Sequence, residues 1–381
     1  MKLAFCIFKY YPFGGLERNF LRITEECLRR GHAVTIYTMS WEGDIPEIFK
    51  EKNCKIINVP FSGVSNHARC ASYVKNLSSS MVRSDYDLVV GFNRMPGLDL
   101  YYCADVCFKA DIQKRHSFIY RCTPRYKTYL EFEKSVFGAD SETYILALSE
   151  IQREIYMREY QTQAERFHPV PAGIDKDRIR SWTSALKRNE ARSELNIGEN
   201  ENMLLMVGSD FRRKGVVRSI DAVASLPDDL KSKTKLFVIG KGKSDRLKRR
   251  ADRCGVNIIF TGTVNNVQKY LSAADLLLHP AVSENTGNAI VEALISGTPV
   301  IATSNCGYAF HVVNADAGRV IDGVNYIQAE FDTALKEFLE EMPEKSGYWS
   351  ECAVKYSDIT DFYSRPAAIT DIIEELGSGR I

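Results

Sequence analysis

The sequence has almost no excess of charge of either sign and no long apolar run. Lys and Arg number 50 against 49 Asp and Glu, so the net charge is only +1, whereas nucleic-acid-binding domains are usually strongly basic. No stretch approaches the ~20 apolar residues of a membrane-spanning helix, and Lys9 interrupts the first apolar run too early for a signal peptide. We therefore expect a cytoplasmic chain that neither binds nucleic acid nor crosses a membrane.

Metal and cofactor motifs are also missing. The ten cysteines include no C-x-x-C pair and the six histidines form no cluster, so we expect reduced thiols and no zinc site. No G-x-G-x-x-G follows the first strand of either half, and residues 238–250 lack the order of a phosphate-binding P-loop. These absences argue against a dinucleotide-dependent dehydrogenase and against an ATPase.

Short apolar runs alternate with amphipathic stretches along most of the chain. The predicted strands are residues 2–8, 33–38, 55–59, 87–92, 143–148, 203–208, 234–240, 256–260, 275–279 and 299–302. The predicted helices are residues 16–30, 215–226, 244–254, 266–273, 287–296 and a last helix after Pro366. Such alternation is typical of parallel sheets with helices on both faces, and its occurrence twice predicts two doubly wound α/β domains.

Breaks in this pattern divide the chain into segments. Pro169, Pro171 and Gly173 interrupt regular structure, which places a domain boundary near residue 172. The predicted segments are an amino-terminal domain over 1–172, a carboxy-terminal domain over 173–355 and a helical tail over 356–381. We expect the tail to pack back on the amino-terminal domain, although periodicity alone does not decide this.

The second half places two carboxylates around the start of a predicted helix. Glu284 and Glu292 are eight residues apart, about two helical turns, so both can face one ligand. The residues whose amides lie at this helix start are Asn285, Thr286, Gly287 and Asn288. Unpaired amides and the helix dipole favour an anion there, while carboxylates accept hydrogen bonds from sugar hydroxyls. A nucleotide sugar suits this arrangement, although the spacing alone also fits two unrelated surface acids.

Two further turns lie at strand-to-helix junctions. Residues 212–214 are Arg-Arg-Lys and follow the predicted strand 203–208. A fixed cation at that position can stabilise a departing diphosphate. In the first half, the glycines at 14–15 occupy the corresponding place, where the backbone can approach a ligand closely. A solvated basic turn and an ordinary tight turn are the alternatives.

Together these motifs resemble the retaining glycosyltransferases of family 4, whose GT-B fold has two facing Rossmann-like domains. Glu284 and Glu292 match the family's E-x7-E pair, and Lys214 and Gly215 match its basic K-G turn. The glycines at 14–15 match its Gly-Gly loop. The resemblance covers essentially the whole chain and implies an α/β protein of the GT-B fold with parallel sheets and a C-terminal helix.

Longer stretches resemble the lipopolysaccharide core heptose glucosyltransferases of Gram-negative bacteria. They include "KYYPFGGLERNF", "VVGFNRMPGLDLYYCADVC" and "VGSDFRRKGV". This narrower resemblance implies transfer of glucose from UDP-glucose to a heptose of a lipid-linked inner-core acceptor, with retention of the anomeric configuration. It implies no cofactor and no divalent metal in the chemistry.

The family resemblance also assigns roles to individual residues. The residues that would hold the donor are Gly14, Gly15, Arg213, Lys214, Glu284, Asn285, Thr286, Gly287, Asn288 and Glu292. The residues assigned to catalysis are Asp99, Lys214 and Glu284. Glu292 would hold the ribose, Lys214 would neutralise the leaving diphosphate, and Asp99 would lie on the acceptor side. Gly14 and Gly15 would approach the donor phosphate from the other domain.

Three departures from the family pattern bear on these roles. Ser209 stands where many relatives have an arginine, so Arg212 or Arg213 has to replace its charge. Asn19 stands where an acid is expected in the nearest relatives. The polar run after Glu284 replaces a more apolar one, which bears on the donor-sugar preference.

Residues 109–134 combine seven Lys or Arg with five aromatic side chains. The cations expected to meet the membrane or the acceptor are Lys114, Arg115, Arg121, Arg125 and Lys127. Basic residues beside aromatic ones suit an anionic lipid surface, and the family resemblance implies a peripheral enzyme on the inner face of the inner membrane. A solvated helix pair with core-facing aromatics is the alternative.

Other functions remain open at this point. A nucleotide-sugar epimerase would share the architecture, but the E-x7-E pair together with the K-G turn fits transfer better. The remaining alternatives are a glycosyltransferase of this fold with another donor sugar or acceptor, and a nucleotide- or lipid-binding module without activity.

Overall fold

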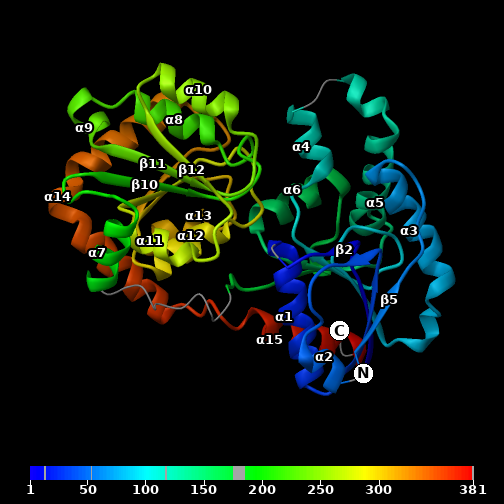
Figure 1. Ribbon diagram of the computed structural model, residues 1–381. Helices are drawn as coiled ribbons and strands as arrows, with labels where there is room; N and C mark the ends of the chain where they lie inside the picture. The colour runs from blue at the N-terminus through cyan, green and yellow to red at the C-terminus, as the bar shows by residue number, and fades with distance from the viewer. Residues whose placement is uncertain (13, 53, 116–117, 175–184, 380–381) are drawn as a thin grey trace. The chain divides into compact units, whose positions relative to one another are not determined.

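The computed structural model describes residues 1–12, 14–52, 54–115, 118–174 and 185–379 (Figure 1). The chain forms two compact units, the first made of Met1–Pro171 with Ser364–Ile381 and the second of Ala172–Tyr363. The predicted break between residues 355 and 356 lies inside helix α14 (Gln328–Ile359), because the buried face of that helix continues through Ala353 and Ser357.

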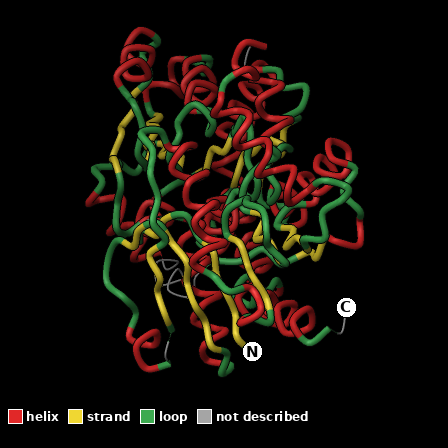
Figure 2. The backbone as a smooth tube through the Cα atoms, turned by 90° about the vertical axis from the view of Figure 1, so that its right-hand side faces the viewer, coloured by secondary structure: helices red, strands yellow, loops and turns green. Residues whose placement is uncertain are grey.

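The first unit is built on a parallel sheet with the strand order β5-β3-β1-β6-β7-β8-β9. Its strands are β1 (Lys2–Cys6), β3 (Ala33–Thr38), β5 (Lys55–Asn58), β6 (Leu88–Gly91), β7 (Leu100–Cys103), β8 (Tyr144–Ala147) and β9 (Phe167–Pro169). Figure 2 shows strands of this sheet side by side next to the N-terminus. The sequence pattern does not predict β7 and β9, because both are short and lack β-branched residues. The strand predictions elsewhere in this unit are confirmed, with ends within two residues of those expected.

A small separate sheet and several helices complete the first unit. The small sheet pairs β2 (Lys9–Tyr10) with β4 (Ser40–Trp41). The helices are α1 (Gly15–Arg29), α2 (Glu47–Glu51), α3 (Asn66–Ser80), α4 (Phe108–Arg115), α5 (Pro124–Phe137), α6 (Glu150–Tyr160) and α15 (Arg365–Gly377). In α1, the apolar residues Phe20, Ile23 and Cys27 are buried at helical spacing, as the sequence predicts.

The carboxy-terminal helix α15 lies beside α1 in the first unit (Figure 1). Arg30, which follows α1, pairs with Asp371 at 2.6 Å, and His32 Nε2 lies 2.7 Å from Glu374 Oε1. The apolar face of α15 buries Ile369 and Ile373 in the same core as β1. These contacts join the two ends of the chain in one unit.

The second unit has a parallel sheet with the strand order β12-β11-β10-β13-β14-β15. Its strands are β10 (Asn202–Val207), β11 (Thr234–Ile239), β12 (Asn257–Gly262), β13 (Leu276–His279), β14 (Val300–Thr303) and β15 (Gly318–Ile321). Its helices are α7 (Ala185–Glu194), α8 (Val216–Ala224), α9 (Asp228–Ser232), α10 (Asp245–Arg253), α11 (Val267–Ala273), α12 (Asn288–Ile295), α13 (Ala309–Asn314) and α14. The sequence pattern does not predict α14, because Pro343 lies inside it and proline normally ends a helix.

Each sheet has a point where the chain reverses its direction of winding. In the first unit β1 lies between β3 and β6, and in the second β10 lies between β11 and β13. Ligands of open α/β sheets bind outside the carboxyl ends of the strands at such points. Among the described residues, no helix is both long and apolar enough to cross a membrane.

Candidate functional site

The carboxyl edge of the second sheet brings the two predicted donor segments together. β10 and β13 are parallel neighbours, so the loops that follow them lie side by side. The Val282 amide donates to the Arg213 carbonyl at 2.8 Å. Gly215 has a φ of 76°, and a Cβ at that position would overlap the Pro280 carbonyl. Glycine is therefore required where the basic turn packs on the second loop.

An ion-pair cluster around Glu284 occupies this edge. Glu284 Oε2 lies 2.6 Å from Lys214 Nζ and 2.7 Å from Arg213 Nη1. The residue is only 9% exposed. Burial by itself raises the pKa of Glu284, but the charges of Lys214 and Arg213 outweigh it and hold the pKa at about 2. The glutamate is therefore ionised. It holds the Lys214 and Arg213 side chains at one carboxylate oxygen.

Two polar atoms near this cluster are buried without a hydrogen-bond partner in the described part of the chain. They are His279 Nε2 and Asn288 Oδ1. Burial, together with the Lys214 charge, lowers the pKa of His279 to about 3, so the imidazole is neutral. His279 Nε2 lies 3.9 Å from Glu284 Oε2. Unsatisfied buried polar atoms are rare in native proteins, and one beside an ion-pair cluster is typical of a site that a ligand completes.

The second carboxylate of the pair is also buried. Glu292 is 8% exposed and lies in the second turn of α12, which begins directly after Gly287. Asn285 is 4% exposed, and the Thr286 carbonyl accepts from the Tyr308 amide at 2.8 Å. The alternative of two solvent-exposed acids is therefore wrong. Sequence spacing could not decide it, because burial depends on the neighbouring strand loops.

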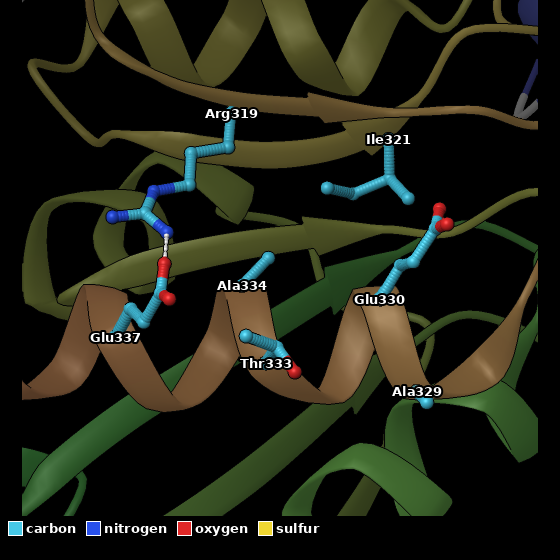
Figure 3. Close-up of a pocket in the computed structure, with 7 residues that line it drawn as sticks. All are labelled: Arg319, Ile321, Ala329, Glu330, Thr333, Ala334 and Glu337. Carbon is cyan, nitrogen blue, oxygen red and sulfur yellow. Dashed lines mark hydrogen bonds and ion pairs between the residues drawn. The ribbon is translucent and has the colours of Figure 1, made fainter.

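A shallow groove of about 420 Å³ lies elsewhere on the second unit, between β15 and α14 (Figure 3). Arg319 on β15 points toward Glu337 on α14, with which it pairs, and it also pairs with Glu341 at 2.8 Å. Its lining includes none of the residues predicted for the donor site. The cation is already neutralised by these carboxylates, so the groove is not a candidate for a diphosphate.

The carboxyl edge of the first sheet carries the glycine loop. Gly14 caps α1 and Gly15 is its first residue. A Cβ on Gly14 would overlap the carboxylate of Glu17, which is 7% exposed in the first turn. Asn19 donates its side-chain amide to the Gly15 carbonyl at 2.9 Å, so it braces this turn. The roles predicted for Gly14 and Gly15 at a donor phosphate stay predictions.

Asp105 lies at the same edge of the first sheet, just after β7. Burial raises the pKa of Glu17, and the nearby Asp105 charge raises it further. Arg94 Nη2 lies 3.5 Å from Asp105 Oδ2, and the Asp105 side chain is 54% exposed. The sequence reasoning missed this carboxylate, although its position after the apolar run "LYYC" was a usable signal.

Asp99 lies at the opposite edge of the sheet from the glycine loop, and its predicted role at the acceptor stays a prediction. It immediately precedes β7, and the four residues of that strand separate it from the carboxyl edge by about 13 Å. Its Oδ2 accepts from the Val89 amide at 2.6 Å and from Arg83 at 2.5 Å. The family resemblance alone implied that role, and it did not indicate at which end of a strand the residue lies. Asp99 instead fixes the start of β7 beside β6.

A buried glutamate holds the segment that follows Asp105. Glu133 on α5 is fully buried and accepts from the amides of Phe108 at 2.6 Å and Lys109 at 2.9 Å. These are the first two residues of α4. Glu133 also forms an ion pair with Arg94. One carboxylate therefore connects α5, the amino end of α4 and the arginine that approaches Asp105.

The basic aromatic stretch divides into an exposed part and a buried part. Phe118 and Ile119 are 76% and 79% exposed, and Arg125 and Lys127 are exposed nearby in the sequence. The aromatic residues buried in the core are Tyr126 and Phe132. Arg121 is partly buried, and the side chains of Lys114 and Arg115 lie outside the described part. The core-facing interpretation holds for Tyr126 and Phe132, whereas membrane contact by the exposed residues stays a prediction.

Comparison with known proteins identifies the family to which the chain belongs. Residues 13–178 match the family model "Glycosyltransferase Family 4", and residues 187–355 match "Glycosyl transferases group 1". The lipopolysaccharide glucosyltransferase WaaG of Escherichia coli K12 is 42% identical over 375 residues, which cover 98% of each chain. The chain belongs to glycosyltransferase family 4.

Solved structures agree with this assignment. The crystal structure of WaaG matches this structure with a TM-score of 0.89 and 41% identity. The match covers 97% of this chain and 99% of the WaaG chain. HepE of Anabaena, solved in complex with UDP and glucose, matches with a TM-score of 0.74 and 17% identity, over 98% and 100%. The two Rossmann-like domains are those of the GT-B fold, as the sequence predicts.

Asp99→Asn and Asp105→Asn are expected to affect this family 4 glycosyltransferase differently. The first should leave turnover nearly unchanged, because Asp99 lies at the amino edge of the sheet. The second should lower turnover about tenfold or more, because a carboxylate at the carboxyl edge can position an acceptor hydroxyl. The rate of nucleotide release in the presence of acceptor measures both. A larger loss in Asp99→Asn would restore the original assignment.

His279 is expected to make the second domain acid-sensitive. Its folded pKa of about 3 lies below the ordinary 6.5, so the unfolded state takes up the proton first as pH falls. The free energy of unfolding then decreases by at most about 1.4 kcal/mol per pH unit. Between pH 6.5 and 5.5, above the ordinary pKa of 4.5 at which Glu284 titrates in the unfolded state, His279→Gln should flatten this decline. Urea unfolding at several pH values in that window measures the free energy of unfolding of the wild type and of His279→Gln. An equal decline per pH unit in both proteins would contradict the lowered pKa of His279.

Proposed function

We propose that this glycosyltransferase moves glucose from UDP-glucose to a heptose of the lipopolysaccharide inner core, with retention of the anomeric configuration. The observation that carries the proposal is the buried cluster in which Glu284 contacts both Lys214 and Arg213. It presents cations suited to a diphosphate beside a carboxylate suited to hydroxyl groups. Glucose as the transferred sugar and lipopolysaccharide as the acceptor follow the name of the lipopolysaccharide glucosyltransferase WaaG, with which the chain shares 42% identity. UDP and the heptose follow the sequence resemblance.

The reaction breaks the bond between glucose C1 and the diphosphate and forms a bond from C1 to the acceptor oxygen on the same face. Lys214 and Arg213 stabilise the departing diphosphate, so the proposal needs no divalent metal and no cofactor. The proton of the acceptor hydroxyl passes to a donor phosphate oxygen. Glu284 and the loop amides of 285–287 hold the glucose hydroxyls, and Glu292 holds the ribose.

The acceptor side is assigned to the first domain. Asp105 replaces Asp99 as the carboxylate that positions the acceptor hydroxyl, because it lies at the carboxyl edge beside Glu17. Glu17 is buried with a raised pKa, so its carboxyl group can hold a proton more readily than an ordinary glutamate. It can thus donate a hydrogen bond to an oxygen atom of a bound substrate.

We assign the enzyme a peripheral position on the cytoplasmic face of the inner membrane. The support is the exposed pair Phe118 and Ile119 together with the exposed cations Arg125 and Lys127. Apolar side chains enter the headgroup boundary while cations attract anionic lipids. Flotation with anionic vesicles at low salt tests this, and absence of co-flotation would remove the assignment.

The experiment that tests the function is UDP release from UDP-glucose, with and without deacylated core oligosaccharide that ends in heptose. UDP-galactose and UDP-N-acetylglucosamine serve as donor controls. We expect release that requires both UDP-glucose and acceptor and that Glu284→Ala abolishes. Donor conversion without acceptor would indicate an epimerase. UDP binding without release from any donor would indicate a binding module or another acceptor.

A further inference from the structure

A strongly basic segment of the second domain follows β11 and contains none of the residues predicted for the donor site. Residues 240–254 contain seven Lys or Arg and two Asp, a net charge of +5, whereas the whole chain has a net charge of +1. The segment comprises the loop after β11 and helix α10, which lies against α8 (Figure 1). The remainder of the chain is therefore slightly acidic, although residues 109–134 are also basic.

Six of these cations are exposed, and we refer to them as the α10 surface. They are Lys241, Lys243, Arg246, Lys248, Arg249 and Arg253. In the part of the chain that the structure describes, none of the six forms an ion pair with a carboxylate. The seventh, Arg250, differs because it pairs with Asp221 on α8 at 2.7 Å.

The geometry of α10 directs this charge outward. Leu247 and Ala251 face the core of the second domain. Arg246, Arg249 and Arg253 follow at spacings of three and four residues, which place them on one face of the helix, away from the core-facing pair. Like charges at these spacings destabilise a helix. The Nε atoms of Arg249 and Arg253 donate to the carbonyls of Asp245 and Arg249. None of the six cations has a carboxylate partner within the described chain, so an external anion would relieve the repulsion.

The loop before α10 continues the surface toward the donor site. The Lys241 amide donates to Ser209 Oγ at 3.2 Å, and Gly242 packs so closely on the Phe211 ring that a Cβ would clash with it. Lys241 and Lys243 therefore lie beside the turn that carries Arg212. The basic surface begins at the carboxyl edge of the sheet and extends along α10.

We propose that the α10 surface docks the second domain on an anionic lipid membrane by contacts with headgroup phosphates. This inference rests on the proposed function, in which the acceptor is carried by a lipid. An extended row of unpaired cations complements a continuous array of phosphates. Residues 240–254 contain no aromatic side chain, whereas proteins that bind single-stranded nucleic acid stack bases on aromatic rings. The chain would then have one proposed membrane contact in each domain.

The test measures sedimentation of the full-length protein with vesicles, in the absence of donor and acceptor. One set of vesicles contains phosphatidylglycerol and the other contains phosphatidylcholine alone. Arg246→Gln, Arg249→Gln and Arg253→Gln are combined in one variant. Because each cation strengthens binding to an anionic surface about fivefold, we expect the loss of three cations to weaken binding to the anionic vesicles about a hundredfold. Added salt should weaken binding of the wild type in the same direction.

A matched control removes the same charge from another exposed helix of the same domain. Lys336, Lys345 and Lys355 on α14 are exposed, and their combined replacement with Gln should leave vesicle binding nearly unchanged. Circular dichroism checks that each variant is folded. UDP release with deacylated acceptor should remain at the wild-type rate, which separates docking from catalysis.

Three results would overturn the proposal. They are unchanged vesicle binding of the α10 variant, an equal loss in the α14 control, and tighter binding of single-stranded RNA than of anionic vesicles by the wild type. Since vesicle binding is measured without substrates, its outcome is independent of the transferase assay. Loss of binding in the α10 variant would support docking even if another donor or acceptor were found.

Discussion

Replacing Lys214 with alanine is expected to lower kcat about 10²–10³-fold, with a much smaller change in the KM for UDP-glucose. Lys214 Nζ lies 2.6 Å from the buried Glu284 carboxylate, which fixes its position. The negative charge on the diphosphate grows as its bond to glucose breaks, so the cation contributes more in the transition state than in the bound donor. Acceptor-dependent UDP release at saturating donor measures this loss.

Arg212 provides a matched control for Lys214. It lies in the same turn but is exposed, so its charge is screened by solvent. Arg212→Ala should therefore leave kcat nearly unchanged, and Lys214→Arg should recover part of the activity by restoring the charge. Equal losses in Arg212→Ala and Lys214→Ala would contradict a specific role for Lys214. Titration with UDP establishes that the donor site of each variant is still formed.

Glu133→Gln is expected to reduce the free energy of unfolding of the first domain by about 3–5 kcal/mol. The glutamate is fully buried, and the Arg94 side chain with which it pairs is only 15% exposed. The glutamine side chain carries no charge, so Arg94 loses its buried counter-charge. It also presents a donor where the amides of Phe108 and Lys109 need an acceptor. The Tyr160 hydroxyl, now 2.5 Å from Glu133, loses a charged acceptor as well.

Hydrogen exchange resolves this effect locally. The amides of Phe108 and Lys109 should exchange much faster in Glu133→Gln, and urea unfolding gives the overall loss. Glu131→Gln is the matched control, because Glu131 lies on the same helix and is exposed. Its effect should stay within about 0.5 kcal/mol. Similar unfolding of both variants would show that the buried network contributes little.

The position of Glu133 connects this stability prediction to the acceptor side. Glu133 holds the start of α4 and also contacts Arg94, which approaches Asp105. In variants that remain folded at low temperature, the KM for the acceptor should rise more than the KM for the donor. A change confined to the donor KM would contradict the assignment of Asp105 to the acceptor.

The sequence predicted the fold because its signals are local. Parallel strands buried on both faces form short apolar runs, and their helices have apolar stripes, so neither depends on distant residues. The alternation therefore gave most of the strands and both doubly wound domains. β7 and α14 were missed for local reasons as well, since β7 lacks β-branched residues and α14 contains Pro343.

The residues of the candidate site could be predicted only where they belong to a motif of recognisable spacing. Glu284, Lys214 and Gly215 lie in loops whose strands are neighbours in the sheet, and the structure brings them together. Asp99 and Asp105 lie at opposite edges of the sheet, because one precedes β7 and the other follows it. Asp105 differs from Asp99 by six positions in the chain but lies at the carboxyl edge of the sheet.

The sequence by itself determined that the chain has two α/β domains, that an acidic pair and a basic turn mark the second, and which family it resembles. Tertiary structure decided that both acids are buried, that Lys214 and Arg213 converge on Glu284, and that α15 packs beside α1. The difference has a physical reason. Periodicity and spacing are properties of neighbouring residues, whereas burial and ion pairing depend on which strands become neighbours after the chain has folded.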